Sequence, residues 1–376
     1  MNDRLLSAAR KTVPTLSANA ARTERELRPA PDSVAAVRDA GLFTLSVPAE
    51  AGGLDTDLHT FVEVIAELGR GCPSTAWVVG LCGAAKKLVG SVVSDTARDA
   101  LLADPHAVVC SSGVPQGASG ERVPGGLRIS GRWAMASGSE LASWAMVMVP
   151  LKGDGPPAVC PTLVPASDLS VDRTWRAAGL SGTSSHTLVA EDVFVPESLV
   201  TFPAGSGPLP APEAMFMGGL AGLAPMIGAT RGAQDVVEAA IAGKRAPYAT
   251  TYARVADSPL GRYWFTEALR RTETAMRRAL RVADAVDALR PGAAMPVAER
   301  VELRVELTTA ARECREAMEL LLDLHGASGF ADDNPLQRFW RDVAVGTRHP
   351  YLTPYTLAED HGRVVFDMMP TVSRTL

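Results

Sequence analysis

The sequence lacks the features that mark membrane, secreted and nucleic-acid-binding proteins. It has no apolar run of the ~18 residues that a membrane-spanning helix needs, and its N-terminal segment, MNDRLLSAARKTVPTLS, has no long apolar core of the kind found in signal peptides. The formal net charge is −5 and the sequence pI is about 5.8, a balance that disfavours nucleic acids and anionic membrane surfaces as partners. We therefore expect a cytoplasmic protein.

Several chemical signatures are also missing. The five cysteines are scattered and form no CxxC pair, so reduced, buried thiols are expected. The six histidines are too dispersed to indicate a metal cluster, and no metal site is predicted. No GxGxxG motif follows a strand, and GxxxxGK[ST], HExxH and GxSxG are absent, which disfavours a nicotinamide Rossmann site, a P-loop, a zincin site and an elbow-type hydrolase. Any chemistry is therefore expected to depend on a bound organic cofactor.

The residues that are present divide the chain into three zones. Residues 1–105 have helical periodicity: in DLHTFVEVIAELGRG the apolar side chains recur at i, i+3, i+4 and i+7, and Asp95 is expected to cap a later short helix. From 106 to 212, short apolar runs are separated by glycine and proline, which predicts a small β-barrel or sandwich that ends in a linker at 203–212. Residues 213–376 contain three long helical stretches, and the small glycines of the first predict close contacts between helices.

Five segments occur in an order that resembles one fold family. They are SVPAEAGGLDTDLHTFVEVIAELGRGCPSTAW, SSGVPQGAS, GRWAMASGSELASW, GLSGTSSHTLVAEDVFVP and HGASGFADDNPLQRFWRD. Each alone is a weak signal, but together they resemble the acyl-CoA dehydrogenase fold. The resemblance implies a mainly α-helical protein with a central β-domain: an N-terminal helical domain (1–105), a middle β-barrel domain (106–212) and a C-terminal four-helix bundle (213–376).

Within that fold, the segments GRWAMASGSELASW and PLQRFWRDVAVGTRH resemble the two-component flavin-dependent monooxygenases, which include the oxygenase of p-hydroxyphenylacetate hydroxylase. Such enzymes take reduced FMN or FAD from a separate flavin reductase, form a flavin hydroperoxide with O2 and transfer one oxygen atom to their substrate. The resemblance implies a cytoplasmic homotetramer that meets the reductase transiently. Phenol hydroxylases of this branch often carry a histidine in the stretch that reads STAWVVGLCGAAKKLVG here. Its absence favours an aromatic or polycyclic substrate bulkier than a simple phenol, such as a biosynthetic intermediate.

Two other functions stay open on the sequence. The first is an acyl-CoA dehydrogenase-like oxidoreductase with tightly held FAD, which needs a carboxylate base to remove the α-proton of an acyl thioester. The positions that correspond to that base hold Pro350 or Val345, depending on the alignment, or the group Leu220, Ala221 and Gly222. None of these side chains accepts a proton, which disfavours dehydrogenation. The second is a catalytically silent binding relative, which the presence of Ser137 and His349 disfavours.

The resemblance implies catalytic roles for Ser137 and His349. Ser137 matches a hydroxyl that lies against the reactive N5 edge of the flavin, although an ordinary strand serine is the alternative interpretation. His349 follows Asp342 by seven residues, where the related monooxygenases carry a histidine that faces flavin and substrate. With an unperturbed pKa of about 6.5, His349 is expected to accept a proton from a substrate OH or NH, to hold the substrate, or to donate to the hydroperoxide. The alternative is a packing residue that bonds a loop carbonyl.

Further residues match positions around the flavin of the related enzymes. These predicted cofactor-binding residues are Ser111, Ser112, Ser137, Arg245, Gly326, Ser328 and Gly329. The two serines at 111 and 112 belong to a glycine-rich loop, whose hydroxyl and N–H groups suit the polar atoms of a flavin. Arg245 and the turn 326–329 resemble groups that approach the flavin of a neighbouring subunit.

Overall fold

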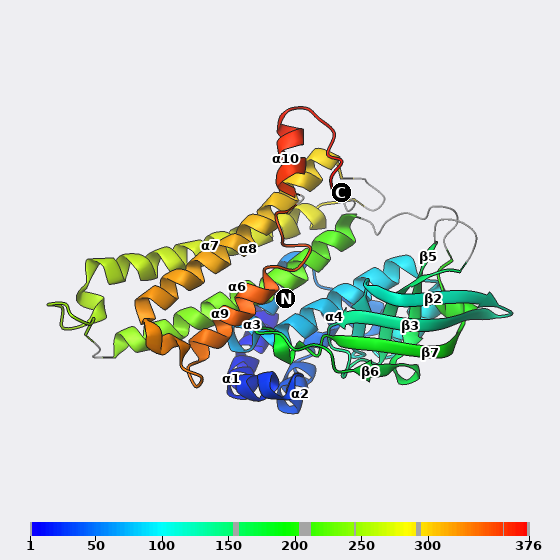
Figure 1. Ribbon diagram of the computed structural model, residues 1–376, viewed down its shortest axis with the longest axis horizontal. Helices are drawn as coiled ribbons and strands as arrows, with labels where there is room; N and C mark the ends of the chain where they lie inside the picture. Colours follow the sequence, from blue (N-terminus) through cyan, green and yellow to red (C-terminus); the bar gives the residue numbers. More distant parts are fainter. Residues whose placement is uncertain are drawn as a thin grey trace.

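The computed structural model describes residues 2–152, 158–202, 212–243, 246–290, 295–355 and 357–373. Helices occupy both ends of the chain and strands occupy the middle. The long C-terminal helices extend to one side in Figure 1, the two sheets lie on the other side, and the N-terminal helices lie between and below them. The structure therefore has the predicted order of a helical region, a β-region and a helical bundle.

The N-terminal region packs around one amphipathic helix, α3 (Leu58–Gly71). The other helices are α1 (Asn2–Glu26), α2 (Pro31–Asp39), α4 (Pro73–Val92) and α5 (Asp95–Leu102). The predicted apolar face of α3 is confirmed, because Phe61, Val64, Ile65 and Leu68 are all buried. The predicted cap at Asp95 is wrong by one residue. Ser94 has the extended backbone of an N-cap and its hydroxyl accepts the N–H of Ala97 at 3.2 Å, so Asp95 is the first helical residue.

The middle region contains two sheets. The first sheet has the strand order β1–β4–β5, where β1 is Val109–Ser112, β4 is Trp144–Pro150 and β5 is Val159–Pro165. The second sheet has the strand order β2–β3–β7–β6, where β2 is Pro115–Val123, β3 is Gly126–Ala136, β7 is His186–Pro196 and β6 is Ser170–Asp172. Side chains from both sheets share one core that includes the fully buried Trp133. The sequence did not predict β2 or β6. Both are edge strands with mostly exposed side chains, so they carry no apolar alternation, and pairing to β3 and β7 holds them.

The C-terminal region is built on α6 (Pro212–Ala242), α7 (Pro259–Asp287), α8 (Val297–His325) and α9 (Pro335–Gly346), followed by the short α10 (Leu357–Val365). The glycines of α6 allow close packing, as predicted. A Cβ built on Gly228 would lie 1.9 Å from the carbonyl oxygen of Ala66 in α3, so only glycine fits there. The linker predicted at 203–212 lies outside the described residues, except that α6 begins at Pro212.

This arrangement brings α4 to the centre of the molecule. It packs against α6 and also contacts β1, α9 and the buried turn Ser181–Thr183 that precedes β7. All five cysteines are free and buried, as expected. Among the helices described, none is long and apolar enough to cross a membrane.

Candidate active site

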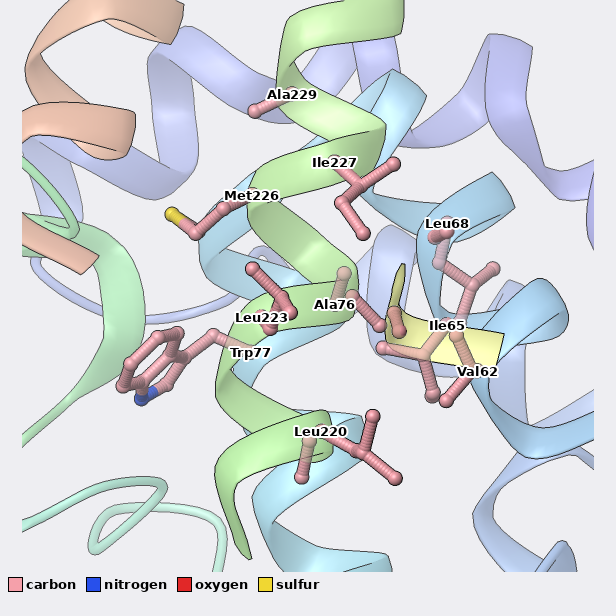
Figure 2. Close-up of a cluster of buried hydrophobic side chains, with 14 of the residues drawn as sticks. Val62, Ile65, Leu68, Ala76, Trp77, Leu220, Leu223, Met226, Ile227 and Ala229 are labelled. Atoms are coloured by element: carbon pink, nitrogen blue, oxygen red, sulfur yellow. The ribbon is translucent and has the colours of Figure 1, made fainter. Parts of the chain in front are cut away.

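Trp77 of α4 connects the two residues to which catalytic roles were assigned. Its indole N–H donates to Ser137 Oγ at 3.2 Å, and its ring meets the ring of His349 edge-on with 5.6 Å between the centroids. Trp77 lies at the margin of the α3–α4–α6 core, with its indole ring turned away from Ile65 and Leu68 (Figure 2). Residues that are far apart in the sequence therefore converge on one tryptophan, which sequence reasoning did not assign to the site.

Ser137 is oriented by an irregularity at the end of β3. The pairing of β3 with β7 shifts between Trp133 and Ala136, and Met135 within this interval has a left-handed backbone with φ of 61°. Such a conformation is unfavourable for a residue with a side chain and is found at positions that the surrounding structure fixes. The shift breaks the alternation of the strand and turns the next side chains to new directions. As a result Ser137 faces Trp77, and the side chain of Met135 is 60% exposed.

A chain of hydroxyl groups continues from Ser137 into the loop before β7. Ser137 Oγ lies 2.8 Å from Ser185 Oγ, which lies 2.7 Å from Thr183 Oγ1. The hydroxyl of Thr183 donates to the carbonyl oxygen of Leu180 at 2.8 Å. Thr183 and Ser185 are both buried. Sequence reasoning missed these two residues, although the cluster of hydroxyl side chains in GLSGTSSH was a signal for them.

Asp342 of α9 fixes the far end of this loop. Its carboxylate accepts the N–H of Leu180 at 2.5 Å, and a Cβ on Gly179 would lie 2.0 Å from the carbonyl oxygen of Arg341, so the loop lies directly on α9. Burial raises the pKa of Asp342 to about 7, because an ionised carboxylate loses its water without gaining a paired cation. The same helix leads into the turn that carries His349.

His349 is held as a neutral imidazole. It is partly exposed, its Nδ1 accepts the N–H of Tyr351 at 3.4 Å, and the rings of the two residues meet edge-on with centroids 5.0 Å apart. Burial lowers the pKa of His349 to about 4. Because Nδ1 is an acceptor here, the proton of the neutral ring lies on Nε2. At neutral pH the ring can therefore donate a hydrogen bond from Nε2, and it is a weaker base than the unperturbed pKa implies.

The glycine face of α6 makes room for the aromatic rings. A Cβ on Gly218 would lie 2.6 Å from Cε2 of Tyr351, and a Cβ on Gly222 would lie 3.4 Å from Cη2 of Trp77. Trp77, His349 and Tyr351 thus form an aromatic row against the first half of α6. Gly222 is one of the positions at which a dehydrogenase would carry its base, and here the ring of Trp77 packs over it.

The predicted cofactor-binding serines Ser111 and Ser112 lie on β1, which is bonded to β3 shortly before Ser137. Ser112 Oγ donates to the carbonyl oxygen of Ala134 at 2.5 Å and accepts the N–H of Val114 at 3.3 Å, so this hydroxyl ties β1 to β3. Ser111 is partly exposed. Val114, at 45% exposure, accepts the N–H of Ala134 through its carbonyl oxygen, so Val114 and the exposed Met135 present apolar surface near the end of β3. An apolar face with a polar edge fits the flat ring system of a flavin, which is apolar on its faces and carries nitrogen and oxygen atoms at its edge.

The other predicted cofactor-binding residues are not brought to this group within one chain. The turn 326–329 begins with Gly326 in a left-handed conformation, φ 78°, and packs against α8 and α9. It lies at the end of the bundle away from the sheets (Figure 1). Ser328 Oγ lies 3.4 Å from Nδ1 of His325, and Gly329 contacts the same ring. Arg245 lies outside the described residues. Within the described chain, His, Cys, Asp and Glu form no group of three or more that suits a metal ion.

Comparisons with known proteins identify the family. Residues 3–103 match the model for the acyl-CoA dehydrogenase N-terminal domain, and residues 220–354 match that for the acyl-CoA dehydrogenase C-terminal domain. The oxygenase subunit HsaA, a flavin-dependent monooxygenase from Rhodococcus jostii (strain RHA1), is 32% identical over 90% of this chain and 91% of its own. The oxygenase component of FADH2-dependent resorcinol hydroxylase from Rhizobium sp. (strain MTP-10005) is 34% identical over 90% of this chain and 88% of its own. The chain belongs to the flavin-dependent monooxygenase oxygenases of acyl-CoA dehydrogenase fold.

A solved structure supports the same assignment. XiaF from Streptomyces sp., in complex with FADH2 and glycerol, superposes with a TM-score of 0.92 at 30% identity and covers 99% of this chain and 97% of that one. The family resemblance, the fold class and the monooxygenase function predicted from the sequence are confirmed. The cofactor is reduced flavin, used with O2. The alternatives of a dehydrogenase and of a silent relative are not supported.

Proposed function

We propose that this oxygenase hydroxylates an aromatic small molecule bound between a flavin whose polar edge lies at Ser137 and the ring of His349. The observation that carries the proposal is the contact of both residues with Trp77. One residue ends a strand of the β-region and the other follows the last helix of the bundle. A site that joins them spans the boundary between these regions, which is where ligand sites commonly form.

The reduced flavin supplies the activation of O2, and the residues of this chain hold and orient it. We assign its polar edge to Ser137, and its apolar face to the surface around Val114 and Met135. Ser112 acts indirectly, because its hydroxyl is used to join β1 and β3. We retain Ser111, Arg245 and the turn 326–329 as cofactor-binding residues, the last two toward the flavin of a neighbouring subunit.

His349 serves the substrate as a hydrogen-bond donor in this proposal. Its pKa of about 4 leaves the ring neutral at pH 7, and the bond from Tyr351 to Nδ1 leaves the proton on Nε2. A neutral donor suits a substrate oxygen or nitrogen with a lone pair. It would also hold the ring of an aromatic substrate at a fixed angle to Trp77, so that one carbon faces the oxygen to be transferred.

The relatives restrict the class of substrate. Their names include resorcinol hydroxylase and indole-3-acetate monooxygenase, which both denote aromatic compounds. The row of Trp77, His349 and Tyr351 offers aromatic edges and the Nε2–H of His349, which fits a substrate of two fused rings or more with a polar substituent. We therefore keep the expectation of a substrate bulkier than a simple phenol.

The test is a reconstitution with free flavin. FMN or FAD, reduced by a separate reductase, should give oxygen-dependent conversion of aromatic probes such as indole-3-acetate and resorcinol, or faster oxidation of the reduced flavin with release of H2O2 when no probe fits. The purified protein should be nearly colourless. A yellow protein whose flavin is reduced by acyl-CoA, or one that binds no reduced flavin at all, would refute the proposal.

Assembly, location and domain limits are also proposals. We infer a cytoplasmic homotetramer that meets a flavin reductase transiently, in which Arg245 completes the flavin site of a neighbour. The exposed tyrosines of the bundle, Tyr248 and Tyr263, support packing between subunits. We place the domain limits at 105 and 212. Light scattering of an active monomer would contradict the assembly.

A further inference from the structure

In the hydroxyl chain that ends at Ser137, only one arrangement of protons lets every hydroxyl group donate a hydrogen bond within the chain or to Leu180. The carbonyl oxygen of Leu180 can only accept, so the single proton of Thr183 is directed to it. Ser185 must then donate to Thr183, and Ser137 must donate to Ser185. The indole N–H of Trp77 can only donate, so it donates to Ser137. Every hydrogen bond of the chain therefore has the same donor-to-acceptor direction, from Trp77 toward Leu180.

This polarity leaves Ser137 as an acceptor toward any ligand. Its proton is bound to Ser185, one lone pair accepts from Trp77, and the second lone pair has no donor among the described residues. Reversing the chain would free the proton of Ser137 but would give up the bond from Thr183 to Leu180. That loss is moderate, because the oxygen of Leu180 still receives the indole N–H of Trp175 at 2.9 Å and the N–H of Thr183 at 3.2 Å.

The two redox states of a flavin differ at the atom that Ser137 is proposed to face. N5 of a reduced flavin carries a hydrogen and donates, whereas N5 of an oxidised flavin only accepts. A reduced flavin adds one hydrogen bond to the chain as it stands. An oxidised flavin gains a bond to Ser137 only if the chain reverses and another bond is lost.

We infer that Thr183 and Ser185 are positioning residues that make the site prefer reduced over oxidised flavin, by fixing the direction of the Ser137 hydroxyl. This inference depends on the proposed function, because it needs the N5 edge to lie at Ser137. The preference amounts to about one hydrogen bond, so its expected size is roughly threefold to tenfold in relative affinity.

The experiment measures dissociation constants, not turnover. Oxidised FMN and FAD, and the same flavins reduced with dithionite under anaerobic conditions, are titrated into the wild type, Ser185→Ala and Thr183→Val. Both variants free the proton of Ser137, so the ratio of the oxidised to the reduced dissociation constant should fall by about threefold to tenfold. A tenfold fall corresponds to about 30 mV in the potential of the bound two-electron couple.

Two further variants separate the direction of the hydroxyl hydrogen bonds from the packing of the loop before β7. Thr183→Ser keeps the donor to Leu180 and should retain the wild-type ratio. Ser139→Ala removes a buried hydroxyl that donates to the carbonyl oxygen of Ser184 at 2.7 Å, which loosens the same loop without breaking the chain, and it should leave the ratio unchanged. If Ser185→Ala fails to fold, Thr183→Val decides the test.

The failure of this inference and the failure of the proposed function give different results. If Ser137→Ala changes the ratio while Ser185→Ala and Thr183→Val do not, the flavin edge lies at Ser137 but the chain does not set the preference. An equal change in Ser139→Ala would also overturn the inference. If Ser137→Ala changes neither dissociation constant, the placement of the flavin itself is wrong.

Discussion

Replacement of His349 distinguishes a hydrogen-bond donor from a general base. Alanine at this position removes one donor from a partly buried site, which is worth about 1–3 kcal/mol. We therefore expect the rate of hydroxylation to fall by roughly fivefold to 150-fold, with reduced flavin bound as before. A general base is usually worth about 10²- to 10⁴-fold. His349→Gln keeps an N–H donor and should recover part of the lost rate.

The pH dependence follows from the lowered pKa of His349. Since the neutral ring is the active form and its pKa is about 4, the rate for the wild type should show no inflection from this residue between pH 6 and pH 9. A base with the ordinary pKa of about 6.5 would instead give a rate that falls below pH 6.5. The assay records product formed and H2O2 released per flavin oxidised, at each pH, for the wild type and both variants.

Two results would refute this reasoning. If the wild-type rate has an inflection near pH 6.5 that both His349→Ala and His349→Gln remove, the residue titrates as a base and the assigned tautomer is wrong. If His349→Ala turns over at the wild-type rate and only melts at a lower temperature, the ring is a packing residue.

Three further predictions concern substitutions of Ser137, Asp342 and Gly218. Ser137→Ala should release more H2O2 and less product, with flavin binding weakened by at most ~1 kcal/mol, as measured by peroxide and product yields. The pKa of Asp342 is raised to about 7, so the stability it contributes is lost as the pH rises from its ordinary value of 3.8 through 7. Asp342→Asn should therefore melt above the wild type at pH 8, and equal melting at every pH would contradict this. Gly218→Ala should displace Tyr351, raise the substrate KM and lower stability by about 1–3 kcal/mol.

The parts of the fold that the sequence predicted are those with strong periodicity or matched segments. The buried face of α3 repeats every three to four residues, and Gly228 and Gly232 of α6 lie against backbone atoms of α3. The edge strands β2 and β6 were missed because exposed strands need no apolar alternation. Their existence depends on partners that come later in the chain, and a single sequence does not contain that information in a local pattern.

The sequence predicted the positions of some candidate site residues but not their chemical state or their contacts. The positions of Ser137 and His349 could be inferred from matched segments, but the pKa of His349 could not, because it depends on how much of the ring is buried. Trp77 was missed because it meets Ser137 and His349 only through contacts made in the fold. Thr183 and Ser185 were missed although GLSGTSSH is rich in hydroxyl side chains, because their hydrogen bonds to each other and to Ser137 depend on how β3 packs against the loop before β7.

The geometry also explains how this chain can lack a carboxylate base without losing chemistry. A dehydrogenase must remove a proton from carbon, and the positions for that base hold Pro350, Val345 or the apolar start of α6. An oxygenase instead needs groups that hold two ring systems in register and keep water and charge away from them. In the function that we propose, neutral His349 and an uncharged hydroxyl chain meet that need. The buried carboxylate of α9, Asp342, accepts the N–H of Leu180 and so holds the loop before β7. On this proposal a neutral donor, His349, stands beside Pro350, one of the positions that correspond to the dehydrogenase base, so the site is uncharged where a dehydrogenase needs a carboxylate.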